Sequence, residues 1–578
     1  MKHLRISRIL PSAIARVIVA SVIPVALFAG ISNAATTTTT TVTPITLTAP
    51  SNIPGVAALP YTGTTAPTFT TSATMANLTV TPDQGVTGTP MVISGTGLAA
   101  NSSVELTWST SSATWVADVE PNTVNYLGTS YSQSTLIMTT VTTSSTGSFS
   151  FSTTAPADFG GVHDIYAVQN GAAVAHGGFE LLRIVSVSPR SGPIGTPITI
   201  TYTSLGASLY TGGASVLWDN HYTGEMMANW TRGTASITIP AAGPVGTHYI
   251  QVANAISYMY MNVIQSPIPY TNGATIAFHT TKDNGPTKAA IEWPASVTPT
   301  VNEVTTLATT GLDTSSTAVA TLSQSSGPVD TNVTLNVTGL SGTGTDPLVW
   351  STVVGNRVNC NSTCWAFASN PLGSGTISNG DITAKITIPD GLGGWHVVQV
   401  MNGSAIEAQV PFYVKESIVP FTNKAGAVVS EGVATANDYT APVNNPTPAQ
   451  VAKQLAAVAV GQSGTGTNTF KEGQEFTISI KGVGWTQLDN TLGVDYDNSY
   501  MGYGCGFNSN GYMVIHLHAT GGVGTHIIDL YPMLYSLSPS FASTPYGMVP
   551  VLSYARDYPG LALGYQVPSI RFAIRVVK

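Results

Sequence analysis

The feature that most constrains the fold of this chain is an internal repeat. Four times a glycine, a short spacer and a histidine lead into alternating apolar residues, most clearly in GPVGTHYIQV, which ends at Val252. The four histidines are His163, His248, His396 and His526. Because side chains two apart on a strand share a face, His248 lies on the face of Ile250 and Val252, which a core would bury. The repeat therefore predicts one inward-facing histidine strand in each of four similar units.

Each unit opens with a strand, a turn rich in glycine and proline, and a second strand. The openings are LTVTPDQGVTGTPMVISGTGL from Leu78, IVSVSPRSGPIGTPITITYTSL from Ile184, ATLSQSSGPVDTNVTLNVTGL from Ala320 and a degenerate fourth that ends at Trp485. In the second strands PITITYT and VTLNVTG, apolar and polar residues alternate, as in half-buried strands. Six or seven short strands in about 80–100 residues, separated by Gly and Pro turns, predict an antiparallel β-sandwich.

A large aromatic ring ends a short strand near the middle of each unit. The four rings are Trp108, Trp218, Trp350 and Tyr496. A ring in this position most simply fills the centre of a sandwich core. A neutral imidazole can pin a sandwich corner nearby, donating a hydrogen bond from one nitrogen and accepting one at the other. We therefore expect structural roles for these rings and for the repeated histidines, because equivalent positions in separate units cannot form one shared site.

The opening VSVSPRSGPIGTPITIT resembles the signature of IPT/TIG domains, which are immunoglobulin-like modules common in exported and surface proteins. The resemblance is good in units one and two, fair in unit three and weak at the opening of unit four. It implies an immunoglobulin-like sandwich without catalytic machinery of its own. Such modules serve as spacers, adhesive stalks and accessory domains of carbohydrate-active enzymes, so the resemblance indicates fold far better than function.

The sequence predicts an all-β chain of four tandem immunoglobulin-like β-sandwich domains with short β or helical inserts. We expect a signal peptide at 1–34, a Thr-rich extended segment at 35–75, sandwiches at 76–182, 183–265, 316–416 and 456–536, inserts at 266–315 and 417–455, and a C-terminal β extension at 537–578. The second insert carries a helix signal, with Thr447 as N-cap and Pro448 in the first turn.

The N-terminus has the pattern of a secretory leader. Lys2, Arg5 and Arg8 precede the apolar stretch VIVASVIPVALFAG. The small residues SNA that follow predict cleavage after Ala34. The apolar stretch is short for a membrane span, and no later run of about 20 apolar residues follows it. We therefore expect a secreted protein that resides at the cell surface and is not integral to the membrane.

Charged residues make up only 8% of the chain, against about 25% in typical soluble domains. The leader holds four of the 20 basic residues, so 16 basic residues remain against 28 acidic ones. This sparse acidic surface argues against nucleic-acid binding, which needs clustered Lys and Arg. Few ionisable groups also predict a stability that depends weakly on pH. Strand edges without charged side chains associate readily, which favours self-association or contact with other surface components.

Two groups of residues are candidate cation sites. MVIHLHATGGVGTH places His516 and His518 on one strand face and His526 at the next strand, a set that could bind a transition metal. YDNSYMG places Asp495 and Asp497 on one strand face as calcium candidates. In both places we favour the simpler interpretation, which is a polar solvent face for the histidines and an Asp-Asn turn for the aspartates.

The cysteines and the catalytic motifs carry less information. Cys360 and Cys364 in CNSTC are a candidate disulfide or, less simply, a metal pair, and Cys505 is left over.

No GxSxG, HExxH or phosphate-loop motif occurs, so we expect no catalytic residue, no enzyme activity and no cofactor. Seven N-glycosylation sequons, a number near chance, begin at Asn77, Asn101, Asn229, Asn332, Asn336, Asn361 and Asn402.

These patterns favour a non-enzymatic surface protein with a structural or adhesive role, which assembles through its modules into a surface layer or filament. The alternative is a protein that binds extracellular polysaccharide or another surface polymer, with exposed Trp and Tyr stacked on sugar rings. An ordered row of aromatic side chains on one sheet face would favour the alternative, whereas large self-complementary surfaces would favour assembly.

Overall fold

The computed structural model is all-β in every part of the chain that it describes. The described residues are 45–46, 63–65, 75–120, 123–208, 211–253, 264, 272–285, 316–355, 365–418, 469–485, 490–507, 509–535, 548–552 and 570–578. The helix expected from Thr447 lies outside them, as do Cys360, Cys364 and the sequon at Asn361. Within the described part, no helix has the length and hydropathy that crossing a membrane requires.

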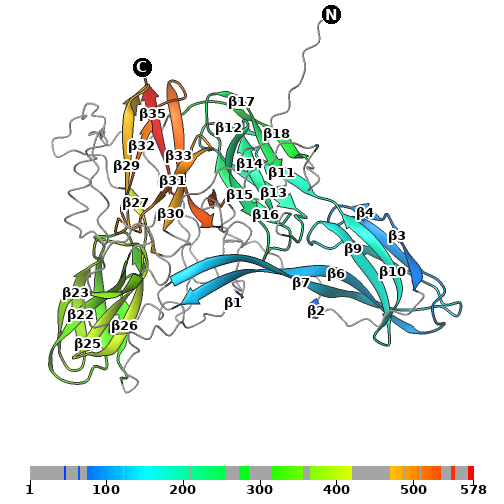
Figure 1. Cartoon of the computed structure of the whole chain (residues 1–578), viewed down its shortest axis with the longest axis horizontal. Helices are drawn as coiled ribbons and strands as arrows, with labels where there is room; N and C mark the ends of the chain where they lie inside the picture. Colours follow the sequence, from blue (N-terminus) through cyan, green and yellow to red (C-terminus); the bar gives the residue numbers. More distant parts are fainter. Residues whose placement is uncertain are drawn as a thin grey trace, which may run out of the picture. The chain divides into compact units, whose positions relative to one another are not determined.

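The second sandwich shows the common plan most simply: a three-stranded sheet packs on a five-stranded sheet (Figure 1). The smaller sheet has the order β11 (Ile184–Ser188), β13 (Pro197–Thr203) and β16 (Ala235–Pro240). The larger sheet has the order β12 (Ser191–Gly192), β18 (Asn272–Thr280), β17 (Gly246–Ala253), β14 (Gly213–Trp218) and β15 (His221–Met227). The two layers and their antiparallel pairs confirm the predicted sandwich.

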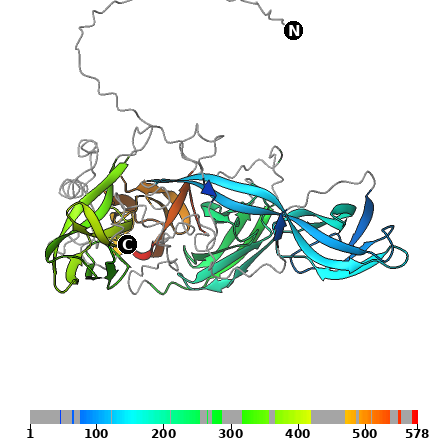
Figure 2. The same ribbon diagram turned by 90° about the horizontal axis from the view of Figure 1, so that it is seen from below.

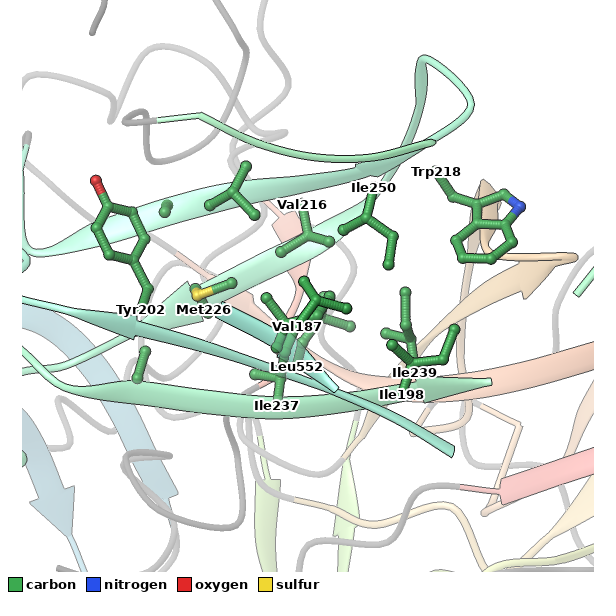
Figure 3. Packing of buried hydrophobic residues seen from close by; sticks show 14 of the residues in the cluster. Val187, Ile198, Tyr202, Val216, Trp218, Met226, Ile237, Ile239, Ile250 and Leu552 are labelled. Atoms are coloured by element: carbon green, nitrogen blue, oxygen red, sulfur yellow. The ribbon is translucent and has the colours of Figure 1, made fainter. Parts of the chain in front are cut away.

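The core between the two sheets follows the alternation seen in the sequence. In β13 the side chains of Ile198, Ile200 and Tyr202 are buried, while Thr199 between them is exposed. Figure 3 shows Ile198 and Tyr202 in one cluster with side chains of the larger sheet, among them Val216, Ile250 and Trp218. Burying one such apolar side chain contributes about 1.5–3 kcal/mol, so the alternation alone selects the register of each strand.

The third and fourth sandwiches repeat the plan. The third pairs β19 (Val319–Leu322), β21 (Asn332–Thr338) and β24 (Ile382–Thr387) against β20 (Ser326–Gly327), β26 (Ala405–Val414), β25 (Gly394–Asn402), β22 (Gly344–Gly355) and β23 (Trp365–Ile377). The fourth pairs β27 (Ser417–Ile418), β29 (Glu475–Lys481) and β32 (Met513–His518) against β28 (Thr469–Lys471), β35 (Ile570–Val577), β33 (Gly524–Tyr535), β30 (Thr491–Tyr496) and β31 (Ser499–Cys505), with β34 (Met548–Pro550) beside β33.

The first sandwich differs because its sheets join and its central hairpin is long. One layer contains β3 (Ala76–Thr81), β5 (Pro90–Gly95) and β8 (Phe149–Thr154), and the other contains β6 (Ser103–Glu120), β7 (Thr123–Thr142), β9 (Gly161–Gln169), β10 (Ala172–Leu181) and the two-residue strand β4 (Gln84–Gly85). Figure 2 shows β6 and β7 as a long ribbon that continues past the other strands of this sandwich. Two short N-terminal strands, β1 (Ile45–Thr46) and β2 (Gly63–Thr65), pair with its edges.

The strands of two sandwiches extend beyond the ranges expected from the sequence. β18 completes the second sandwich although it lies in the expected insert 266–315. β27 and β35 complete the fourth, although they lie in the expected insert 417–455 and the expected extension 537–578. In each case the completing strand is separated from its partners by a long connection or is only two residues long, so the local sequence pattern does not show where it pairs.

Candidate functional site

Each repeated histidine lies inside its own sandwich, stacked on the aromatic ring of the same unit. The ring centroids are 4.4 Å apart for Trp108 and His163, 4.9 Å for Trp218 and His248, 4.8 Å for Trp350 and His396, and 5.5 Å for Tyr496 and His526. All four histidines are buried. The rings and histidines that the sequence repeats therefore form one pair per sandwich, which we call the corner pair.

In the first and third sandwiches both ring nitrogens of the histidine face backbone oxygens. His163 has Nδ1 2.7 Å from Ser109 O and Nε2 2.6 Å from Phe159 O. His396 has Nδ1 3.3 Å from Ser351 O and Nε2 3.0 Å from Leu392 O. Each imidazole thus connects the residue that directly follows the aromatic residue to the turn that precedes the strand of the histidine.

In the second and fourth sandwiches an aspartate replaces one of these backbone oxygens. His248 has Nδ1 2.6 Å from Asp219 Oδ2. His526 has Nδ1 2.6 Å from Asp497 Oδ2, and its Nε2 lies 2.9 Å from Gly522 O. The other oxygen of Asp497 accepts the Ile527 N–H at 2.9 Å. Both oxygens of this carboxylate are therefore engaged inside the sandwich.

These aspartates are the first of the two central residues in tight hairpin turns. Asp219 and Asn220 have φ of 49° and 68°, and Asp497 and Asn498 have φ of 49° and 61°. Positive φ at both central residues defines the type I′ turn, which Asp and Asn tolerate and which matches the twist of antiparallel strands. The interpretation of YDNSYMG as a turn is therefore confirmed. Asp495 lies on β30, two residues before Asp497 and outside the turn, and does not share a site with Asp497.

The sandwiches thus alternate between two kinds. The first and third continue their hairpins beyond the aromatic residue, to Glu120 on β6 and Gly355 on β22. The second and fourth close at once in the Asp-Asn turn between β14 and β15 and between β30 and β31. The sequence already distinguishes the two kinds. Of the four aromatic residues, only Trp218 and Tyr496 are followed by the dipeptide Asp-Asn.

The first and second sandwiches meet through one short parallel bridge between backbones. Gly160 pairs with Gly206, and its N–H donates to Leu205 O at 2.8 Å. The Leu205 N–H in turn donates to Gly233 O at 2.9 Å. A Cβ on Gly160 would lie 1.9 Å from Ser204 O, so only glycine permits this approach.

The third and fourth sandwiches meet through the same arrangement. Gly393 pairs with Gly484, and its N–H donates to Val483 O at 2.9 Å. The Val483 N–H donates to Gly511 O at 3.0 Å. A Cβ on Gly393 would lie 1.6 Å from Gly482 O. The bridge therefore occurs twice in the chain, each time between a sandwich of the first kind and the one that follows it.

An ion pair accompanies each bridge. Buried Asp158 accepts hydrogen bonds from Trp108 Nε1 at 2.9 Å and from Arg232, whose Nη2 lies 3.2 Å from Oδ1. At the second bridge Lys481 Nζ lies 2.6 Å from Asp390 Oδ2, which also accepts from the Tyr512 hydroxyl. The sequence analysis missed both pairs, since their acids and bases come from different units and show no common spacing.

The metal candidates do not converge. His516 and His518 flank the Glu475 carboxylate, with their nearest nitrogens 3.7 Å and 3.9 Å from its oxygens. His526 lies on β33 in the opposite sheet and is bonded to Asp497. Among the residues that the structure describes, no group of three His, Cys, Asp or Glu side chains could hold a metal ion. The candidate set of His516, His518 and His526 is therefore not brought together in the structure, because its strands belong to different sheets. Cys505 is an exposed free thiol.

The fourth sandwich contains two buried carboxyl groups that the sequence pattern did not predict. Asp495 on β30 is fully buried and faces Asp529 on β33, which Arg571 holds through two nitrogens at 2.7 Å and 3.0 Å. Among the residues that the structure describes, neither oxygen of Asp495 has a hydrogen-bond partner. Burial, together with the charge of Asp529, raises the pKa of Asp495 well above its ordinary value. The protonated form is consequently favoured at this position, because a neutral carboxyl group costs far less to bury than a charged one.

The environments of two corner histidines shift their pKa values in opposite directions. Burial lowers the pKa of His396 to about 4, against the effect of its bonds to backbone oxygens. Burial also acts to lower the pKa of His526, but the hydrogen bond and charge of Asp497 outweigh it and raise the value. The corner pairs of the third and fourth sandwiches thus differ electrostatically as well as geometrically.

We expect the third sandwich to lose stability in acid through His396. The folded-state pKa of about 4 lies below the ordinary value of 6.5, so the unfolded chain takes up the proton first. Stability present above pH 6.5 is then lost as the pH falls toward 4, by about 3 kcal/mol. Hydrogen-exchange protection of β25 at pH 7 and pH 4 measures this loss, with β13 of the second sandwich, which carries no histidine or carboxylate, as the internal reference. In a His396→Phe variant the pH dependence should disappear, and a dependence that persists in this variant would contradict the assignment.

We expect the Asp497→Asn substitution to lower the pKa of His526. The substitution keeps the turn, because Asn adopts positive φ readily, but it removes the charge that favours the imidazolium. An NMR titration of the His526 ring in the wild type and the variant measures the shift. The matched substitution Asp219→Asn in the second sandwich should leave the His526 titration unchanged, and an unchanged His526 in Asp497→Asn would refute the role of this carboxylate.

No protein-family model and no curated protein matches the chain. Among solved structures the chain is similar to FdeC, an Escherichia coli adhesin, at 13% identity over 60% of this chain and 98% of that one, with a TM-score of 0.14. It is also similar to the ICAM-5 D1–D4 ectodomain fragment at 10% identity over 86% of this chain and 99% of that one, with a TM-score of 0.14. Values this low carry no inference about function. The class that the fold itself defines is a tandem array of immunoglobulin-like β-sandwiches.

Proposed function

We propose that the chain is an exported structural or adhesive protein of the cell surface that assembles with copies of itself. The observation that carries this proposal is the nearly uncharged outward face of the three-stranded sheets in the first three sandwiches. In the fourth sandwich this face carries Glu475, Lys481, His516 and His518. In the second sandwich the outward side chains of β13 and β16 include Thr199, Thr201, Ser236 and Thr238, and none of them is charged. The strands of the same sheet in the first sandwich likewise present serine and threonine.

Charge on such faces is the ordinary protection against association. Charged side chains on a surface keep proteins soluble, whereas a surface with little charge promotes association. On the corresponding sheet of the third sandwich, Lys385 is the one charged side chain among the described outward residues. Faces of hydroxyl groups with so little charge can approach an identical face without electrostatic repulsion.

The polysaccharide-binding alternative finds less support. It needs aromatic rings aligned on one exposed surface. In the described part of the chain, Tyr249 and Tyr503 are the aromatic side chains with large exposure, and they lie on β17 and β31 of different sandwiches. The aromatic rings that the sequence repeats are buried in the corner pairs, which leaves them unable to stack on a sugar.

Negative-stain microscopy of the purified mature chain tests the proposal. We expect ordered sheets or fibres that form with increasing concentration. The double substitution Thr199→Lys and Thr238→Lys places two like charges on the outward face of the second sandwich and should suppress assembly, while Lys385→Thr should not. Monodisperse monomers of the wild type at high concentration would refute the proposal.

A further inference from the structure

The sequons of the chain differ in whether the folded protein leaves room for a glycan. An N-linked glycan needs an asparagine whose amide nitrogen reaches solvent, with a Ser or Thr two positions later. Asn229 is 3% exposed, and its amide nitrogen donates to Thr129 Oγ1 at 3.3 Å. Asn402 is exposed but donates its amide nitrogen to Glu407 Oε1 at 2.9 Å. A glycan on either nitrogen would break these contacts, and at Asn229 it would also have to enter the protein interior.

Asn332 and Asn336 differ from these two sites. Both are exposed on β21, where positions four apart lie on the same face of the strand. The Asn332 Oδ1 accepts a hydrogen bond from the Thr387 hydroxyl at 2.8 Å, and the Asn336 Oδ1 accepts one from the Thr383 hydroxyl at 3.1 Å. Because the oxygen of each amide points to the neighbouring strand, the nitrogen of each amide points away from it, toward solvent.

The spacing of the pair leaves room for two modifications. Four residues along a strand correspond to about 13 Å, which separates two glycan chains at their base. At the aligned positions of the second sandwich the chain has Pro197 and Thr201, so this sheet face carries no sequon there. The sequons Asn77 and Asn101 are also exposed, but no hydrogen bond orients their amide groups among the described contacts.

We propose that Asn332 and Asn336 are N-glycosylation sites and that their glycans cover the outward face of the three-stranded sheet in the third sandwich. The donor is an oligosaccharide linked to a lipid phosphate or pyrophosphate. The amide nitrogen forms a bond to the anomeric carbon and loses one proton to a base, while the bond from that carbon to the phosphate oxygen breaks. The lipid phosphate leaves with the electron pair, and no oxidant or reductant is needed.

The consequence concerns the surfaces available for assembly. Two hydrated glycans on β21 prevent the uncharged face of the third sandwich from approaching another sheet. The corresponding face of the second sandwich, which has no sequon at the aligned positions, stays unmodified. The modification therefore restricts association to part of the chain, and this consequence rests on the proposed function, whereas the modification itself requires only export.

The test uses the full chain with its own leader, secreted by a eukaryotic host that makes lipid-linked oligosaccharides. Intact mass of the folded, secreted monomer should include a glycan at each of the two sites. Glycosidase release in ¹⁸O water, followed by peptide mapping, should mark Asn332 and Asn336. Thr334→Ala and Thr338→Ala should each remove one glycan mass. The control Thr231→Ala, which destroys the sequon at Asn229, should leave the number of attached glycans unchanged.

The outcomes separate this inference from the proposed function. A secreted, folded chain without glycans at Asn332 and Asn336 overturns the inference and leaves the assembly proposal standing. A glycan at Asn229 in the folded chain overturns the argument from burial. A chain retained inside the cell with its leader uncleaved overturns both the inference and the proposed export.

Discussion

Replacing Gly393 with alanine should uncouple the third sandwich from the fourth. The new Cβ would lie 1.6 Å from Gly482 O, well inside the contact distance of carbon and oxygen. The strands must therefore separate, which breaks the Gly393–Val483 hydrogen bond and weakens the nearby pair of Lys481 and Asp390. We expect a loss of about 3 kcal/mol or more in the coupling between these sandwiches, at the upper end for overpacked sites.

Differential scanning calorimetry measures this coupling, because two sandwiches that unfold together in the wild type should unfold in separate transitions in the variant. Gly160→Ala should have the parallel effect at the first bridge, where the Cβ would lie 1.9 Å from Ser204 O. Gly178→Ala is the matched control, since its Cβ would meet no atom closer than 3.5 Å. If Gly393→Ala and Gly178→Ala unfold alike, the bridge does not couple the sandwiches.

Replacing Trp350 with alanine should destabilise the third sandwich by about 3–5 kcal/mol, the range for deleting a large buried aromatic side chain. Trp350 is 3% exposed, stacks on His396 and packs at 6.3 Å from the Phe412 ring. The substitution leaves a cavity at the centre of the core and removes the surface that orients the imidazole. Local loss of stability should therefore appear first in β22 and β25.

Limited proteolysis with peptide mapping measures where the Trp350→Ala chain opens. Cleavage should concentrate between 316 and 418 while the second sandwich stays intact. The exposed aromatic Tyr503 provides the control, because its replacement by alanine should change stability by less than about 0.5 kcal/mol. Equal effects of the two substitutions would show that the corner pair contributes no more than a surface ring.

The parts of the fold that could be predicted are those with a local pattern. The alternation in β13 and β21, and the repeated aromatic and histidine positions, each reflect burial of every second side chain, which the sequence displays directly. The parts that could not be predicted depend on pairing over distance. Nothing near Ile570–Val577 indicates that this strand lies beside β33.

The candidate site divides in the same way. The turn at Asp497 could be predicted because Asp and Asn favour positive φ within two residues. The burial of Asp495 next to Asp529 could not be predicted. These two residues lie 34 positions apart in the sequence and meet only because β30 pairs with β33. Likewise, the separation of His526 from His516 follows from the assignment of their strands to different sheets.

The two glycine bridges have a consequence for how such a chain can change in length. Each bridge joins a sandwich with an extended hairpin to the following sandwich, which has an Asp-Asn turn. The two surfaces that form a bridge therefore come from a pair of consecutive sandwiches. Gain or loss of one sandwich would leave a glycine segment facing no carbonyl partner, whereas gain or loss of a pair would preserve both glycine bridges. The glycine bridges therefore tolerate a change in chain length by whole pairs better than a change by single sandwiches.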